Sequence, residues 1–137
     1  MKNIFVDTNI IIDLLTERQL FSKMAVKIFD LSKKKNFKIF ISSHTIAATH
    51  YILKKYIDDK KLRLILLDLL NFVSVIVIDD LILKTALKSN HKDFEDGIQI
   101  LVAQSNRNID CIVTRNIKDF KLASINVYTP DEFLNKI

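Results

Sequence analysis

The chain contains almost no glycine, proline or cysteine: 137 residues include one of each, and no tryptophan. A single glycine excludes the G-x-G-x-x-G pattern of dinucleotide sites and the glycine-rich phosphate loops, so a phosphate group would have to be bound by other means. The one cysteine, Cys111, excludes an intramolecular disulfide and a cysteine-rich zinc site. It fits the reducing environment of the cytoplasm.

Long apolar runs are also missing. The longest, such as Val73–Ile78, are far shorter than the roughly 20 residues that a membrane-spanning helix needs. The N-terminus has no signal-peptide pattern. We therefore expect a cytoplasmic protein with no membrane partner. The net charge of +5 is compatible with a polyanionic partner, although mildly basic chains are common.

What the sequence does contain is a globular composition, with 49% hydrophobic and 27% charged residues. Its length and the absence of a linker predict one domain over residues 1–137. Short apolar strands alternate with helices, and the strands are predicted at 4–6, 37–41, 73–78, 111–114 and 125–128. This alternation predicts an α/β fold, a three-layer α/β/α sandwich with a central, mainly parallel sheet of four to five strands.

Several local signals give the helix boundaries. Thr8 or Asn9 is expected to cap the first helix, and Asp79-Asp80 to open a later one. Thr129-Pro130-Asp131-Glu132 is a capping box with proline at the first helical position. The β-branched run 73–78 predicts a buried strand, and residues 115–121 a polar loop around Phe120.

Three aspartates follow predicted strands or begin helices. Asp7 ends the first strand, Asp96 lies in the first turn of a helix, and Asp119 follows the strand at 111–114. The carboxyl ends of parallel strands meet at one edge of a sheet, so we expect these carboxylates to gather there and to need a counter-charge. Oxygen ligands suit Mg²⁺ or Mn²⁺, whose chemistry at such sites is phosphodiester hydrolysis.

In three segments the chain resembles a PIN domain over essentially its full length: Phe5-Val6-Asp7-Thr8-Asn9, Asp93-Phe94-Glu95-Asp96 and Val113-Thr114-Arg115-Asn116-Ile117-Lys118-Asp119-Phe120. The resemblance implies a compact nuclease fold and a Mg²⁺- or Mn²⁺-dependent endoribonuclease. Many small bacterial members are VapC-type toxins of toxin–antitoxin pairs. An RNA substrate, a homodimer and an antitoxin protein partner are therefore also expected.

The resemblance also implies roles for individual residues. Asp7, Asp96 and Asp119 are the expected catalytic and metal-binding carboxylates. The expected supporting residues are Asn9, Asp93, Thr114 and Asn116, which orient the carboxylates by hydrogen bonds. Arg115 is expected to contact a phosphate of the substrate.

The chain departs from the family pattern in the helix after the second strand. Ala48 stands where an acidic residue is usual, and the sequence has no acid between Asp30 and Asp58. Thr49, His50 or water would have to fill the gap. The alternative function is a PIN-fold RNA- or protein-binding module with weakened or lost catalysis.

Simpler interpretations compete with some of these assignments. Asp7 could be only a helix cap, and Asp93 only a partner of the helix dipole. A receiver-like phosphoacceptor domain is a more distant alternative, since Asp79-Asp80 after the third strand imitates its acceptor site only poorly. The stripe Leu62, Leu66 and Leu70 is either core or a surface that a dimer or an inhibitor covers.

Overall fold

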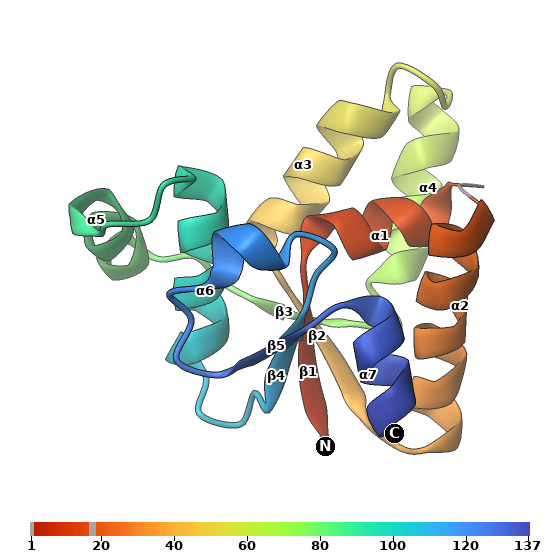
Figure 1. The fold of residues 1–137 in the computed structure, drawn as a ribbon. Coiled ribbons are helices and arrows are strands. Elements are labelled where there is room, and N and C mark those ends of the chain that lie inside the picture. Colours follow the sequence, from red (N-terminus) through yellow and green to blue (C-terminus); the bar gives the residue numbers. More distant parts are fainter. Residues whose placement is uncertain (1, 17–18) are drawn as a thin grey trace.

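The computed structural model describes residues 2–16 and 19–137 (Figure 1). The elements follow in the order β1 (Asn3–Val6), α1 (Thr8–Leu15), α2 (Gln19–Lys34), β2 (Lys38–Ser42), α3 (Ser43–Leu53), α4 (Asp59–Leu69), β3 (Ser74–Ile76), α5 (Asp80–Lys88), α6 (Phe94–Ser105), β4 (Cys111–Val113), the 3-10 helix η1 (Ile117–Phe120), β5 (Asn126–Tyr128) and α7 (Pro130–Lys136). None of the helices in these ranges is long and apolar enough to cross a membrane.

The five strands form one sheet in the order β3-β2-β1-β4-β5, and all neighbouring pairs are parallel. The chain builds outward from β1 to β3 and then returns to the other side of β1 for β4 and β5. The sheet therefore reverses its direction of growth between β1 and β4. In open α/β sheets, ligands bind outside the carboxyl ends of the strands at this switch point.

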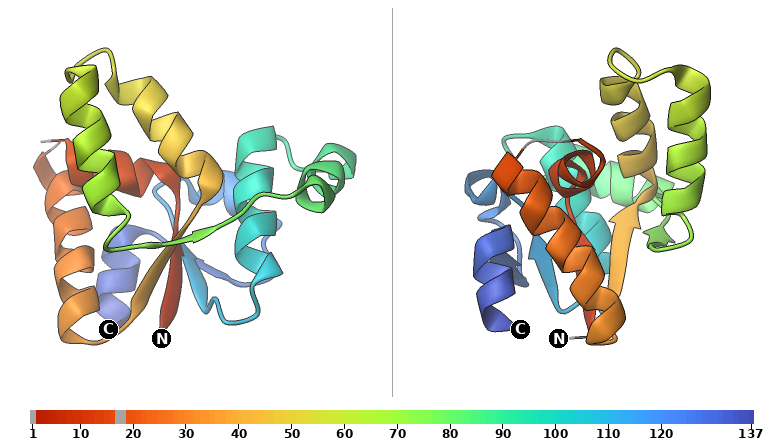
Figure 2. Two further views of the ribbon diagram at one scale, coloured as in Figure 1. Left: turned by 180° about the vertical axis from the view of Figure 1, so that it is seen from behind. Right: turned by 90° about the vertical axis from the view of Figure 1, so that its right-hand side faces the viewer.

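The alternation of side chains along β1 explains why a helical layer covers each face of the sheet. Ile4 and Val6 are fully buried in a core shared with α1, α2, α4 and α7, whereas Phe5 is buried in the core that α5, α6 and η1 cover. Successive side chains of a strand point to opposite faces, so one apolar strand supplies both cores. Figures 1 and 2 show helices on both sides of the sheet. The predicted three-layer α/β/α fold is confirmed.

Two predictions about strands and caps were wrong. The run 73–78 is not a buried strand: β3 covers only Ser74–Ile76, and Val75 and Val77 are exposed. The reason is its place at the edge of the sheet, which sequence pattern does not reveal. The first helix is capped by neither Thr8 nor Asn9, because Asp7 is its N-cap residue.

Two further expectations are refined. The predicted polar loop 115–121 contains the 3-10 helix η1, with Phe120 buried in the core. Of the leucine stripe on α4, Leu62 and Leu66 are core residues, and only Leu70 is exposed. The capping box at Thr129 and the Asp79 cap of α5 are present as predicted.

Candidate active site

Asp7 lies at the carboxyl end of β1, next to the end of β4, and is 5% exposed. Its Oδ1 accepts hydrogen bonds from the backbone N–H of Thr8 (2.8 Å) and from Nε2 of Gln99 (3.2 Å). Its Oδ2 accepts from the hydroxyl of Thr114 (2.8 Å) and from Nδ2 of Asn9 (3.3 Å). Burial raises the pKa of Asp7, while the bonds from Thr114, Gln99 and Thr8 act in the opposite direction.

Asn116 links the other two predicted carboxylates. Its Nδ2 donates to Oδ2 of Asp119 (2.6 Å) and to Oδ2 of Asp96 (3.2 Å). Its backbone N–H donates to the Thr114 hydroxyl (3.0 Å), which in turn donates to Asp7. A continuous chain of hydrogen bonds therefore joins all three aspartates, and it runs through the two supporting residues on the loop after β4.

Asp93 is the N-cap of α6, and its Oδ1 accepts from the backbone N–H of Asp96 (3.0 Å). It therefore places a fourth carboxylate beside the site. The pKa of Asp96 is raised to about 7, first by burial and then by the negative charges of Asp7, Asp93 and Asp119. The cluster is thus short of positive charge, which is the condition that a bound cation relieves.

The chemical types of the available ligand atoms fit a divalent cation. These atoms are carboxylate and amide oxygens, which Mg²⁺ and Mn²⁺ prefer, with no cysteine and no histidine among the predicted ligands. Within 2–16 and 19–137, no three acidic, histidine or cysteine side chains are grouped closely enough to hold one ion as they stand. Ligation by all three aspartates would require their side chains to draw together. Their roles as metal ligands stay predictions.

Gln99, which is 2% exposed, belongs to the site although the sequence pattern did not predict it. Its Oε1 accepts from the Ser42 hydroxyl (2.6 Å), and its Nε2 donates to Asp7 and contacts the Thr45 hydroxyl (3.2 Å). It therefore ties the end of β2 and the start of α3 to the carboxylate on β1. A signal was present in the sequence, because Gln99 is the one polar residue in the buried run 97–100 and lies one helical turn after Asp96.

Asp13, a buried acid on α1, is a second residue near the site that the sequence pattern did not predict. The guanidinium of Arg115 donates to both of its oxygens, from Nε to Oδ2 (2.6 Å) and from Nη2 to Oδ1 (3.2 Å), and lies 4.2 Å from the centroid of the Phe21 ring. The backbone N–H of Arg115 donates to Oδ1 of Asn9 (3.4 Å). Arg115 thereby anchors the loop after β4 to α1. Its expected contact with substrate phosphate stays a prediction.

The structure also describes the surroundings of Ala48. Thr45 is the α3 residue whose hydroxyl reaches the site, 3.1 Å from that of Thr8. Ala48 follows Thr45 by three residues and so lies on the same face of α3. Thr49 is fully buried, and no residue that the structure describes forms a hydrogen bond with its hydroxyl. Nε2 of His50 lies 2.6 Å from Oδ1 of Asp59 on α4.

Comparisons with known proteins agree with this geometry. A PIN domain family profile matches residues 3–118, and the chain belongs to the PIN domain family. The protein named ribonuclease VapC1 from Aquifex aeolicus (strain VF5) is 28% identical over 141 residues, which cover 98% of this chain and 95% of that protein. The predicted family is therefore confirmed.

Solved structures show the same fold. A chain of a toxin–antitoxin complex from Klebsiella pneumoniae superposes with a TM-score of 0.67 at 27% identity, over 93% of this chain and 97% of that one. A chain of the DNA-bound VapBC complex from Salmonella typhimurium gives a TM-score of 0.71 at 18% identity, over 95% and 99% of the two chains. The second likeness concerns the fold alone.

Proposed function

We propose that this protein is a Mg²⁺- or Mn²⁺-dependent endoribonuclease and the toxin of a bacterial toxin–antitoxin pair. The observation that carries the proposal is the hydrogen-bonded chain from Asp7 through Thr114 and Asn116 to Asp96 and Asp119, at the switch point of a PIN-domain sheet. The names of the relatives from Aquifex aeolicus and Klebsiella pneumoniae support both parts of the proposal. The buried, unpaired Cys111 is compatible with action in the cytoplasm.

In this proposal Asp7, Asp96 and Asp119 hold the cation, and the polar groups around them fix their orientation. A bound divalent cation supplies positive charge that polarises the phosphoryl oxygen and favours deprotonation of the attacking water. Thr114 and Asn9 hold the inner carboxylate, Asp7, in place. Asn116 keeps the other two carboxylates near each other, at the end where RNA can approach.

Ala48 modifies the proposal. Among the described residues, the side chains of β2 and α3 that join the hydrogen bonds around Asp7 carry hydroxyl groups, those of Ser42 and Thr45. Because the number of negative ligands sets the affinity of such a site, we expect it to hold one cation loosely and to cleave slowly. Titration with Mn²⁺ in a calorimeter tests this, since two tight sites would contradict it.

Two partner surfaces belong to the proposal. A cavity of about 580 Å³ between α3 and α4 is lined mainly by apolar side chains, including those of Tyr51, Leu67 and Leu70. Its exposed apolar area fits an amphipathic segment of an antitoxin.

On the other side of the molecule, α5 exposes Leu81, Leu83 and Leu87. We propose that this face joins two copies in a homodimer.

A cleavage assay on structured RNA with Mn²⁺ tests the enzyme. We expect wild-type protein to cleave, EDTA to abolish cleavage, and Asp7→Asn to reduce it by at least about a hundredfold, because one charged ligand is lost. Asp79→Asn is the matched control. It makes the same change at the N-cap of α5, where asparagine caps as well as aspartate, and should cleave normally.

The alternative function, an RNA- or protein-binding module with weakened or lost catalysis, predicts a different result in the same assay. If wild-type protein binds RNA but cleaves none with Mg²⁺ or Mn²⁺, the chain is a binding module. If Asp7→Asn cleaves as fast as wild type, the activity belongs to a contaminating nuclease and the mechanism is wrong.

A further inference from the structure

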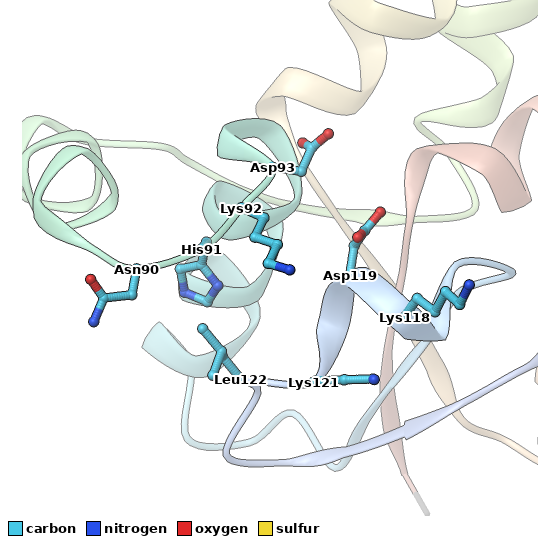
Figure 3. A pocket seen from close by; sticks show the side chains of 8 residues that line it. All are labelled: Asn90, His91, Lys92, Asp93, Lys118, Asp119, Lys121 and Leu122. Carbon is cyan, nitrogen blue, oxygen red and sulfur yellow. The ribbon is translucent and has the colours of Figure 1, made fainter.

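A cavity of about 580 Å³ opens beside the carboxylate cluster, between the loop before α6 and η1 (Figure 3). Its lining includes two carboxylates of the cluster, those of Asp93 and Asp119. Asp93 and Asp119 lie together at one end in Figure 3, and Lys121 and Leu122 lie at the other. The cavity is therefore continuous with the candidate site, and its volume is within the range of roughly 300–1,000 Å³ of small-molecule sites.

Three lysines give the cavity its charge. Lys92 comes from the loop before α6, and Lys118 and Lys121 come from η1 and its end. In the part of the chain that the structure describes, none of the three forms an ion pair with a carboxylate. All three are exposed. Unpaired ammonium groups around a concave surface bind phosphate.

The loop that carries Lys92 is held against α6 by a close contact between His91 and Gly97. Gly97, the one glycine of the chain, is in the first turns of α6, and a Cβ added there would lie 2.9 Å from Cβ of His91. The His91 side chain therefore packs directly on the α6 backbone, which no other residue type at position 97 would permit without a shift. The loop that forms this side of the cavity is thus fixed to the same helix that carries Asp96.

The cavity also has surfaces suited to a base. The imidazole of His91 lines it, and so does Leu122, which is 60% exposed although it is apolar. Flat aromatic side chains beside cationic ones are the common pattern of single-stranded nucleic-acid sites, because every base has a π-face on which such a ring can stack.

We propose that this cavity holds a ribonucleotide of single-stranded RNA next to the bond that is cut, with Lys92 and Lys121 binding its phosphate and His91 and Leu122 contacting its base. The inference rests on the proposed function, because it places the RNA strand relative to the carboxylates. It gives the strand a path across the molecule, from Asp119 along η1 to Leu122.

Binding of a fluorescein-labelled oligouridine to the full chain, followed by fluorescence anisotropy in EDTA, tests the site without cleavage. The variant K92A/K121A should bind on the order of tenfold more weakly. The slope of log K against log salt should fall by about 0.7, because both lysines contact one phosphate and about 0.7 counterion is released per phosphate of a single strand. The variant Leu122→Ala should weaken binding without changing this slope.

The matched control is K34A/K35A. It removes the same charge at the end of α2, which leads into the amino end of β2, whereas the candidate site lies at the carboxyl ends of the strands. It should bind as wild type does. Unchanged binding by K92A/K121A, or an equal loss in K34A/K35A, overturns the site.

Parallel cleavage assays with Mn²⁺ separate this inference from the proposed function. If wild type cleaves and K92A/K121A keeps its KM, the nucleotide site is wrong and the enzyme assignment stands. If wild type binds the oligouridine through these lysines but cleaves nothing, the site stands and the enzyme assignment is wrong.

Discussion

At the scale of single residues, Asp7 shows that a structural role and a site role can belong to one side chain. It caps α1 through Oδ1, which accepts from the backbone N–H of Thr8, as the simpler interpretation of the sequence requires. Its Oδ2 meanwhile accepts from Thr114 and Asn9, which connect it to the other aspartates. The cap interpretation and the site interpretation are therefore both compatible with the structure.

The residue that we expect to limit metal affinity is Ala48. Ala48→Glu should tighten Mn²⁺ binding by on the order of tenfold, because it adds a carboxylate on the face of α3 that carries Thr45. Isothermal titration calorimetry measures this directly.

Ala47→Glu is the control for this change. It adds the same charge to the neighbouring position of α3, where Ala47 is exposed and lies on another face of the helix. It should leave the Mn²⁺ affinity unchanged. Equal affinities for both variants and wild type would mean that position 48 does not correspond to the usual acidic residue.

At the scale of elements, α6 carries Asp96 of the candidate site. Through the close contact of Gly97 with His91, it also holds the loop that lines the cavity. Gly97→Ala should lower the free energy of unfolding by about 1–3 kcal/mol, because the new Cβ would meet Cβ and Cγ of His91 at 2.9 and 3.0 Å. Urea denaturation measures the change.

A double-mutant cycle isolates the cause of that loss. In a His91→Gly background the obstructing atoms are absent, so Gly97→Ala should become stabilising by about 1 kcal/mol, the difference in helix propensity between glycine and alanine. The same loss in both backgrounds would show that the contact with His91 is not the reason for the glycine.

At the scale of the whole molecule, we propose that the exposed leucines of α5 join two copies. Leu81 and Leu87 are 69% and 71% exposed, on a helix that packs mainly on α6 and projects from the body of the protein (Figure 1). L81S/L87S should convert a dimer into a monomer in sedimentation velocity, because the apolar area that drives association is lost.

The control uses two leucines of α4 with similar exposure. Leu64 and Leu67 are 63% and 64% exposed, and L64S/L67S should sediment as wild type does. Dissociation of this variant instead would place the contact between copies on α4 and would leave α5 without a partner.

The sequence by itself determined the fold class, because strand and helix periodicity and the alternation of elements are local properties that tertiary contacts here reinforce. The sequence also made it possible to predict that Asp7, Asp96 and Asp119 lie near one another, since each follows a strand or lies in the first turn of a helix, and the pattern shows where these elements end or begin. Thr114 and Asn116 were predicted from the resemblance to the PIN domain, because both lie in the segment 113–120 that carries it.

Only the tertiary structure decided which residues meet across the sheet. The edge position of β3, the burial of Gln99 against Asp7, and the pairing of Asp13 with Arg115 depend on strand order and helix packing. A pattern shows that an element has an apolar face, but it does not show which partner covers that face. That is why residue types and helix ends could be predicted, while the polar contacts between distant segments could not.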